Sequence, residues 1–274
     1  MSVYSRPREP SRARPDRALP SDNGVLRLRA LLIAGALLLV SCRTGWRAQT
    51  ASPAAPTSTP VLTATPSPPP ELDGTYAAIP RHRYLPMWNT PGASTADFTF
   101  DARDPFGDIS RLLVDGVRAD DAGTLWYRLL LPVRPNGRAA WVHQDEVRLV
   151  PRDERIVVDL SERTLRYWIG RRLVDRFSVG VGLPQFPTAL GTFYVWIKVS
   201  YPDPNGPYGA YALGLSGFSP VLSDWPGGGR MAIHGTTDPS DRGREVSHGC
   251  IRVYNPDMLK LRGVPLGTPV IIRR

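Results

Sequence analysis

Short segments with alternating apolar and polar residues, separated by turn residues, dominate the second half of the chain. Residues 156–160, 164–169 and 191–197 have this pattern, and 268–273 form the last such segment. Strands about ten residues apart, with Gly and Ser turns between them, are typical of an antiparallel β domain. The pattern predicts a mainly β domain over residues 153–274.

Helix signals are scarce in this half. The best one covers residues 255–263, with Asn255 expected as the N-cap, a proline in the first turn and Gly263 past the end. Residues 201–229 are rich in Pro and Gly, and we expect them to form a long loop. Its Gly-Gly-Gly run lacks the Gly-Lys-Ser/Thr ending of a phosphate-binding loop.

A smaller β module is expected over residues 74–150. Residues 125–130 and 139–143 are rich in strand formers, and Asn136-Gly137 between them is a strong hairpin signal. A further short strand is expected at 147–149. Trp-Tyr-Arg, a turn, Gly-Arg and Trp-Val resemble the C-terminal half of a bacterial SH3-like domain. The resemblance implies a small β-barrel that binds wall peptides or packs beside a catalytic domain; a spacer without a ligand is the alternative.

Residues 1–41 are expected to be a leader. Two arginines precede an apolar run over residues 30–40, which at eleven residues is shorter than the about 20 of a membrane-spanning helix. A basic flank and a short apolar core are typical of a secretory signal. The following Leu-Val-Ser-Cys resembles a bacterial lipobox, which implies cleavage before Cys42 and its lipidation. An incidental cysteine is the alternative, and a translation start at Val25 is a further hypothesis.

Residues 42–73 are expected to be a linker. Seven prolines fall within residues 51–70, among Ala, Ser and Thr. This composition favours extended polyproline II structure and prevents a packed core. At about 3.1 Å per residue such a segment spans roughly 60 Å, which suits a tether between a membrane anchor and the cell wall.

Composition narrows the class of partner. The 274 residues are 42% hydrophobic, enough for one or two packed domains. Of the net charge of +9, residues 1–41 hold seven arginines and three acidic residues, so +5 remains for the rest. That mild basicity suits an anionic cell wall. No basic stripe with interleaved aromatics occurs, so we expect no nucleic-acid partner.

The candidate chemistry lies in two short motifs, Ile-His-Gly-Thr at 233–236 and Ser-His-Gly-Cys-Ile-Arg at 247–252. They hold two of the four histidines and one of the two cysteines. A thiol becomes a strong nucleophile as thiolate, and a nearby imidazole is a common way to produce one. Cys250 is the candidate nucleophile, with an inert buried cysteine as the alternative. The same Cys and His residues suit zinc, but no fourth ligand follows at metal spacing, so no metal is expected.

The segment from 155 to 272 resembles the L,D-transpeptidase catalytic domain of bacterial cell-wall enzymes, with its motifs in order. They are Ile-Val-Val-Asp-Leu, Val-Gly-Val-Gly, Thr-x-x-Gly-x-Phe, Ile-His-Gly-Thr, Ser-His-Gly-Cys-Ile-Arg and Gly-Thr-Pro-Val. Ala189 stands where the family often has Pro. The resemblance implies a mainly β fold, with a β-sandwich or barrel catalytic domain behind the small SH3-like barrel.

By the same resemblance the function is peptidoglycan cross-linking in cell wall biogenesis, at the extracytoplasmic cell envelope and without a cofactor. Cys250 would form a thioester with a stem peptide, with His234 as proton acceptor and donor. The backbone carbonyl of Gly235 would orient that histidine. Carbapenem-type β-lactams are the implied covalent inhibitors. An L,D-carboxypeptidase and a non-catalytic wall-binding lipoprotein are the alternatives.

The remaining site residues are assigned supporting parts. His248 is a competing base, and we expect it instead near the oxyanion, with the amides of His248, Gly249 and Cys250 as donors. Arg252 is a candidate for a substrate carboxylate, or for a structural salt bridge. Ser247 is expected to tie down its loop at the substrate-binding site. Tyr208 and Tyr211 are candidate substrate-lid residues, or ordinary loop aromatics.

Overall fold

The computed structural model describes residues 71–224 and 227–274. The leader, Cys42 and the linker up to residue 70 lie outside the described residues, so the predictions made for them stay predictions. In the described part of the chain, no helix combines the length and the apolar character that crossing a membrane requires.

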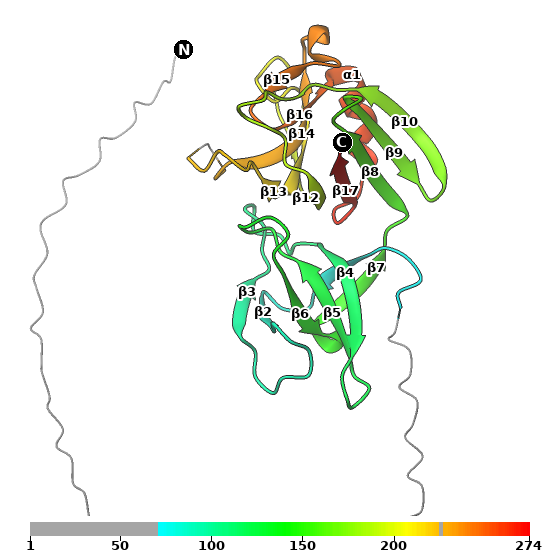
Figure 1. Ribbon diagram of the computed structural model, residues 1–274, viewed down its shortest axis with the longest axis vertical. Helices are drawn as coiled ribbons and strands as arrows, with labels where there is room; N and C mark the ends of the chain where they lie inside the picture. Colours follow the sequence, from blue (N-terminus) through cyan, green and yellow to red (C-terminus); the bar gives the residue numbers. More distant parts are fainter. Residues whose placement is uncertain (1–70, 225–226) are drawn as a thin grey trace, which may run out of the picture. The chain divides into compact units, whose positions relative to one another are not determined.

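The strands before residue 152 form one antiparallel sheet and one separate hairpin (Figure 1). The sheet has the order β6-β5-β4-β1-β7, and β2 pairs with β3. Fully buried apolar side chains, among them Leu85, Leu112 and Leu129, fill its core. The elements are β1 Tyr76–Pro80, β2 Tyr84–Met87, β3 Phe98–Asp101, β4 Leu112–Ala119, β5 Leu125–Leu130, β6 Ala139–His143, the 3-10 helix η1 Gln144–Glu146 and β7 Val147–Pro151. We call this part the first module; its SH3-like identity stays a prediction.

The predicted hairpin forms between β5 and β6, but its connection is longer than the Asn-Gly signal suggested. The Leu131 amide donates to the Arg138 carbonyl at 2.8 Å, which closes an eight-residue loop from 131 to 138. Within it, the Arg138 amide donates to the Pro135 carbonyl, with Gly137 in the left-handed region at φ 81°. Asn-Gly therefore makes a turn inside the loop, and the rest of the loop is free for other contacts.

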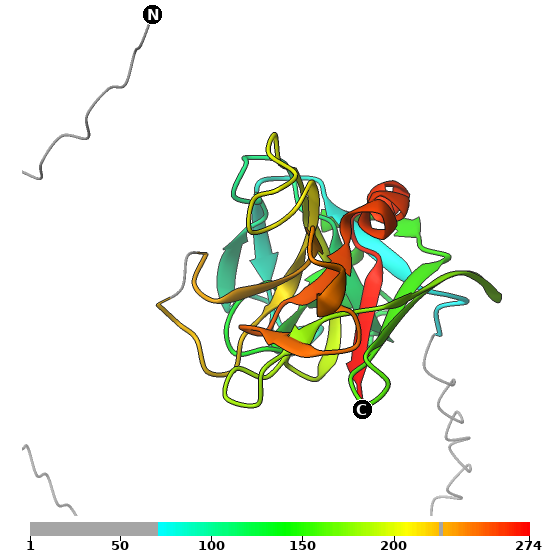
Figure 2. The same cartoon turned by 90° about the horizontal axis from the view of Figure 1, so that it is seen from above.

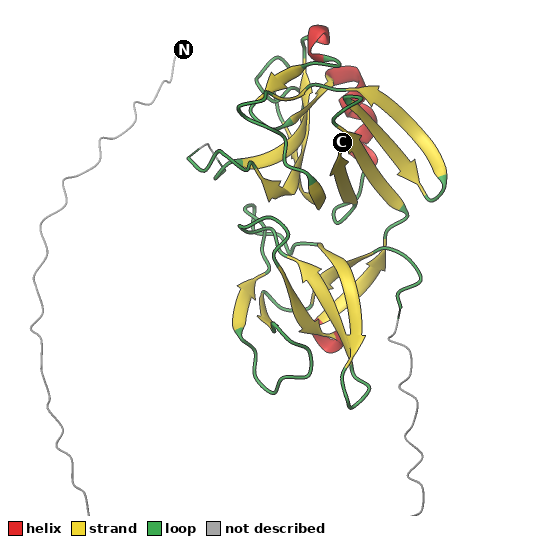
Figure 3. Cartoon of the chain, in the orientation of Figure 1, coloured by secondary structure: helices red, strands yellow, loops and turns green. Residues whose placement is uncertain are grey.

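Eight of the strands after residue 153 form one sheet in the order β10-β9-β8-β17-β12-β13-β14-β16. Figure 3 shows that strands dominate this part of the chain and that its helical segments are short. Two neighbour pairs, β8 with β17 and β14 with β16, run parallel. The predicted antiparallel pairing holds for the other neighbour pairs of this sheet and is wrong for these two. Strand β14 reaches β16 through a crossover rather than a tight turn. The strands are β8 Glu154–Asp159, β9 Thr164–Ile169, β10 Arg172–Ser178, β11 Val181–Gly182, β12 Gly191–Ser200, β13 Tyr211–Phe218, β14 Arg230–Thr236, β15 Glu245–Ser247, β16 Ile251–Tyr254 and β17 Pro269–Arg273. The crossover carries β15, which pairs with β11, and the 3-10 helix η2 Pro239–Asp241.

The prediction of one long loop over residues 201–229 is wrong, because β13 lies within it. All eight residues of β13 are buried, so no alternating pattern marks the strand. Gly214 and Gly217 are needed for packing: a Cβ there would lie 2.4 Å from Ile197 and 2.3 Å from the Phe193 ring. The glycines that suggested a loop are therefore the ones that let β13 pack closely on β12.

The middle of strand β12, residues 193–196, is buried on both faces. Phe193 and Val195 pack into the core of the C-terminal sheet, whereas Tyr194 and Trp196 pack with the core of the first module. The Tyr194 hydroxyl donates to the Leu130 carbonyl at 3.2 Å, and the Trp196 Nε1–H donates to Ser110 Oγ at 3.0 Å. Successive residues of a strand point to opposite faces, so one strand serves two cores.

The predicted C-terminal helical segment is present as α1 Asn255–Met258, followed by the 3-10 helix η3 Leu259–Gly263. It lies beside the sheet (Figure 1, Figure 2), and Met258 and Leu261 enter the core. Tyr254 rather than Asn255 is the N-cap. The Asn255 side chain instead accepts from the Ala210 amide and donates to the Pro204 carbonyl, which anchors the segment before β13.

Candidate active site around Cys250

Parallel pairing of β14 and β16 brings the two motifs together. Ile233 lies opposite Ile251 in the core, and His234 lies opposite Arg252 on the other face. Cys250 precedes Arg252 by two residues, and side chains two apart in extended chain share a face. The chain between β14 and β16 therefore forms the crossover, and the side chains of His234 and Cys250 reach the same cavity.

That cavity has a volume of about 100 Å³ and gathers six of the residues expected from the sequence. His234, His248 and Cys250 line it together, with Arg252, Ser247 and Tyr208. The other lining residues are Pro207, Ser219, Leu222, Gly229, Arg230 and Met231. Four segments of the chain thus meet at one thiol.

His234 is held in one orientation and is uncharged. Its side chain is 3% exposed, and Nδ1 lies 2.9 Å from the carbonyl oxygen of Gly235. A carbonyl only accepts, so this contact assigns the proton to Nδ1 and leaves Nε2 as the basic nitrogen. Burial lowers the pKa of His234 to about 4, against the opposing effect of the Gly235 carbonyl. At neutral pH the ring is therefore an unprotonated base.

The thiol is also uncharged in the resting site. Burial raises the pKa of the partly exposed Cys250, although the Ala232 amide and the Arg252 charge lower it. A depressed histidine pKa and a raised thiol pKa both favour neutral imidazole and thiol over an ion pair. The thiol proton therefore has to leave as the sulfur attacks, and His234 is the acceptor expected for it from the sequence.

The loop before the thiol is held by hydrogen bonds within itself. The Ser247 hydroxyl donates to the Cys250 carbonyl at 2.6 Å and accepts from the Gly249 amide at 3.1 Å. Ser247 thus ties down the loop as expected, but at 1% exposure its hydroxyl is not offered to a substrate. Gly249 has φ +111°, a conformation that residues with a Cβ rarely adopt.

The predicted oxyanion site needs one correction. The Gly249 amide points at Ser247 Oγ, so it is engaged inside the loop and is not directed at a substrate oxygen. The amides of His248 and Cys250 remain the predicted donors. The exposed ring of His248 packs on Phe186, with ring centroids 4.6 Å apart, so the 183–188 segment supports this side of the site.

The two candidate tyrosines separate. Tyr208 lines the cavity, and its ring meets the His234 ring edge-on at 5.3 Å. Tyr211 is 4% exposed, begins strand β13 opposite Ser200 of β12, and packs in the core. The lid assignment is therefore wrong for Tyr211. Sequence reasoning missed Tyr201, which stacks on Tyr208 at 5.5 Å. Burial raises the pKa of Tyr201, and nearby Tyr208 and Cys250 raise it further.

Arg252 makes the structural salt bridge that was the alternative to carboxylate binding. Its Nη1 lies 3.4 Å from Asp241 Oδ2, and the buried Asp241 also accepts from Thr236 Oγ1 at 2.8 Å. The guanidinium still borders the cavity. Asp241 was missed because an acidic residue in a turn has no distinguishing sequence signal.

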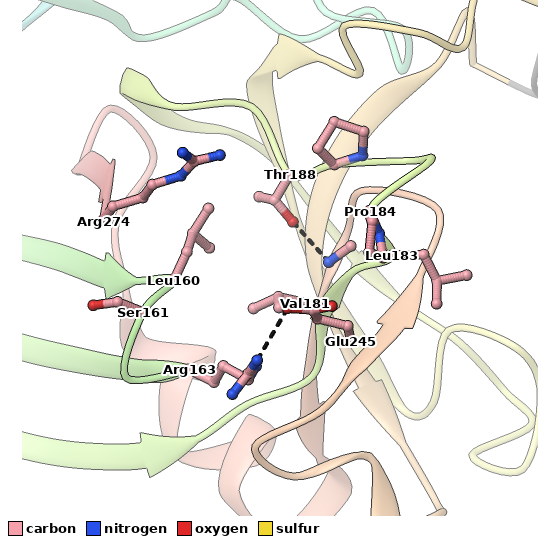
Figure 4. Close-up of a pocket in the computed structure, with 11 residues that line it drawn as sticks. Leu160, Ser161, Arg163, Val181, Leu183, Pro184, Thr188, Glu245 and Arg274 are labelled. Atoms are coloured by element: carbon pink, nitrogen blue, oxygen red, sulfur yellow. Dashed lines mark hydrogen bonds and ion pairs between the residues drawn. The ribbon is translucent and has the colours of Figure 1, made fainter.

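A larger cavity, of about 420 Å³, lies elsewhere in the same domain (Figure 4). Arg163 pairs there with Glu245 at 3.0 Å, and Thr188 Oγ1 accepts from the Gly182 amide at 2.9 Å. Its lining contains neither thiol nor imidazole, so it lacks the groups that acyl transfer requires. Volume alone does not identify the candidate site.

The zinc alternative lacks a cluster of ligands. Across residues 71–224 and 227–274, no three His, Cys, Asp or Glu side chains are grouped as metal ligands would be. His234, His248 and Cys250 share a cavity without forming such a group.

Comparison with known proteins agrees with the motifs. The L,D-transpeptidase catalytic domain described as YkuD matches residues 153–272. A provisionally named L,D-transpeptidase YkuD of Bacillus licheniformis is 41% identical over 119 residues, which cover 43% of this chain and 64% of that protein. The chain therefore spans slightly less than two thirds of that relative.

Two further matches are similar in kind. A provisionally named L,D-transpeptidase YqjB of Bacillus subtilis is 30% identical over 135 residues, which cover 45% of this chain and 73% of that protein. The solved catalytic domain of an Enterococcus faecium L,D-transpeptidase acylated by ertapenem is 25% identical, with a TM-score of 0.34, over 45% of this chain and 98% of that one. On the family match and the sequence relatives, the chain belongs to the L,D-transpeptidase family.

Proposed function

We propose that the protein is a peptidoglycan L,D-transpeptidase that works through a thioester on Cys250. One observation carries the proposal: Cys250 and His234 line the same cavity, with His234 Nδ1 held by the Gly235 carbonyl and Nε2 left as a base. Family membership adds the reaction class and the stem-peptide substrate. No cofactor takes part in the proposed chemistry.

In the first half-reaction, Cys250 Sγ attacks the carbonyl carbon at the L-centre of the diamino acid of a tetrapeptide stem. His234 Nε2 accepts the thiol proton as the C–S bond forms, because both groups start uncharged. The oxyanion is bound by the backbone amides of His248 and Cys250. The bond to the terminal D-alanine then breaks, and His234 returns the proton to the departing amine.

In the second half-reaction, an amine from a neighbouring stem attacks the thioester carbonyl and loses a proton to His234. The C–S bond breaks and a new amide forms, which is the cross-link. The sulfur leaves as thiolate and regains the proton from His234. The free enzyme is thereby restored, and every proton taken up has been released.

The rest of the chain gives the proposed setting. The leader, the lipobox-like ending at Cys42 and the Pro-rich linker support a lipid-anchored protein whose catalytic part faces the cell wall. The Enterococcus faecium relative acylated by ertapenem supports carbapenem-type β-lactams as covalent inhibitors of Cys250.

Incubation with purified tetrapeptide muropeptides, followed by mass spectrometry of the products, tests the proposal. Cross-linked dimers that lack one D-alanine are the expected products. Trimmed tripeptides alone would assign an L,D-carboxypeptidase instead, with water as acceptor. Identical products from wild type and Cys250→Ala would refute catalysis by this thiol.

A further inference from the structure

Part of the cavity wall is held from outside its own domain. Most of the residues Ser219, Leu222 and Gly228–Met231 line the cavity with Cys250. They belong to the connection from β13 to β14 and to the first two residues of β14. We call these residues the β13–β14 wall. Its own backbone bonds include the Ser219 amide to the Gly229 carbonyl at 2.7 Å. Further bonds reach the wall from loop 131–138 of the first module.

Arg134 supplies three of these bonds. Nη1 donates to the Ser219 carbonyl at 3.1 Å, and Nη2 donates to the carbonyls of Leu222 at 2.7 Å and Gly228 at 2.9 Å. The guanidinium also lies 4.7 Å from the centroid of the Phe218 ring. A planar fork of donors can gather several carbonyls at fixed angles, which a single ammonium cannot do. One side chain therefore joins the beginning and the end of the connection between β13 and β14.

Asn136 extends the end of β13. Its Nδ2 donates to the Phe218 carbonyl at 2.8 Å, and its Oδ1 accepts from the Phe218 amide at 2.8 Å. This reciprocal pair imitates the exchange of bonds between two antiparallel strands. It stands where β13 leaves the sheet and enters the wall. Asn136 thus fixes the direction in which the wall begins.

Arg230 makes a further hydrogen bond between the two modules, in this case donated by the C-terminal domain. It lines the cavity, and its Nη2 donates to the Pro132 carbonyl at 3.1 Å, while Nη1 donates to the Leu215 carbonyl at 3.1 Å. Its guanidinium lies 3.9 Å from the Trp196 ring centroid and 4.2 Å from that of Phe218. Side chains and carbonyls from both modules therefore meet at the base of the wall.

We propose that Arg134 and Asn136 are positioning residues for the active site: the first module sets the shape of the β13–β14 wall, and through it the binding of the stem peptide. The inference rests on the proposed function for its substrate. It gives the first module a part in catalysis that needs no wall ligand of its own. Loss of either side chain should weaken substrate binding more than it slows the chemical step, because the wall does not hold Cys250 itself.

Hydrogen exchange tests the positioning directly and without turnover. In Arg134→Gln, the Ser219 amide should exchange roughly 5- to 20-fold faster, since partly exposed charge-assisted bonds have been lost. In Asn136→Ala, the same increase is expected at the Phe218 amide. Arg138→Gln is the matched control: it lies in the same loop, but its guanidinium lies over Phe98 of its own module. Exchange at residues 156–158 should stay unchanged in all three.

Kinetics with tetrapeptide then separate positioning from simple adhesion between modules. For Arg134→Gln we expect KM to rise roughly tenfold and kcat to fall less than twofold, with Arg134→Lys in between and Arg138→Gln like wild type. Adhesion alone would lower the melting temperature and leave KM and local exchange unchanged. That outcome, or equal effects of Arg134→Gln and Arg138→Gln, overturns the inference.

A thiol-accessibility assay keeps the two proposals distinguishable. If the wild type does not turn over tetrapeptide, the proposed function fails, yet the wall can still be tested by alkylation of Cys250. The ratio of rates for a bulky and a small iodoacetamide should change at least threefold in Arg134→Gln and not in Arg138→Gln. An unchanged ratio, together with unchanged exchange, overturns the positioning role whatever the substrate.

Discussion

Two walls of one cavity are stabilised in different ways. The Ser247–Cys250 side is held by its own serine, its glycine and the pairing of β16 with β14. The β13–β14 wall depends on Arg134, Asn136 and a carbonyl of another module. The reacting thiol is thus placed by local sequence, and the shape of the space in front of it by a distant segment. Chemistry and substrate fit should therefore respond to different mutations.

The largest expected effect is a loss of turnover from mutations on the Cys250 side of the cavity. His234→Gln should lower kcat about 10²- to 10⁴-fold, because the base is lost. His248→Gln should lower it roughly tenfold, because its ring supports the loop and does not take the proton. Product formation from tetrapeptide muropeptides measures both variants, with circular dichroism to check folding. A larger loss in His248→Gln than in His234→Gln would reverse the assignment.

The next effect concerns the side of the cavity formed by the β13–β14 wall. Trp196→Ala should destabilise the protein by about 3–5 kcal/mol, since a nearly buried aromatic side chain leaves a cavity between two cores. Urea unfolding measures the change. Trp168→Ala, on β9 under the guanidinium of Arg155, is the control and should cost much less. Equal losses of stability in the two variants would mean that the packing of Trp196 between the two cores is not especially important for the fold.

A pH change acts on the thiol side through His234. Its folded pKa of about 4 lies below the ordinary 6.5, so the fold favours the neutral ring. The contribution of neutral His234 to the free energy of unfolding is therefore fully present above pH 6.5. It is lost as the pH falls toward 4, and the total loss is about 3 kcal/mol. Urea unfolding between pH 7 and 4 measures the loss. His234→Gln should lack this decline, and an equal decline in that variant would show that another group causes it.

The smallest of the predicted effects concerns the loop itself. Ser247→Ala removes the bond to the Cys250 carbonyl and leaves the Gly249 amide without its acceptor. A loss of about 1–3 kcal/mol is expected, with turnover reduced roughly tenfold. Thermal unfolding and product analysis measure the two changes. Ser223→Ala, at an exposed position that follows Leu222 but is not itself part of the lining, should match wild type. Unchanged turnover in Ser247→Ala would show that the loop does not need the Ser247 hydrogen bonds.

The sequence predicted the residues that carry chemistry better than those that shape the site. Cys250, His234 and the Gly235 carbonyl lie in short motifs, and the predicted carbonyl contact is present. The strands with alternating patterns were also predicted. Strand β13 was missed because burial on both faces removes alternation and because Gly214 and Gly217 resemble loop residues.

Arg134 and Asn136 could not be found from sequence for a different reason. Their partners are backbone carbonyls and an amide more than eighty residues away, and a backbone group carries no residue-type signal. The pKa directions at His234 and Cys250 likewise depend on burial, which follows from the packed structure rather than from the motif.

Catalysis through a Cys250 thioester is tested most directly by acid-quenched mass spectrometry of the protein mixed with a tetrapeptide stem whose free side-chain amine is acetylated, so that no acceptor amine is present. The thioester mechanism predicts a mass increase equal to the stem peptide less D-alanine, mapped to the peptide that contains Cys250 and sensitive to hydroxylamine. Cys250→Ala should show no such adduct. Turnover without any adduct on Cys250, or the same adduct in Cys250→Ala, would contradict the mechanism.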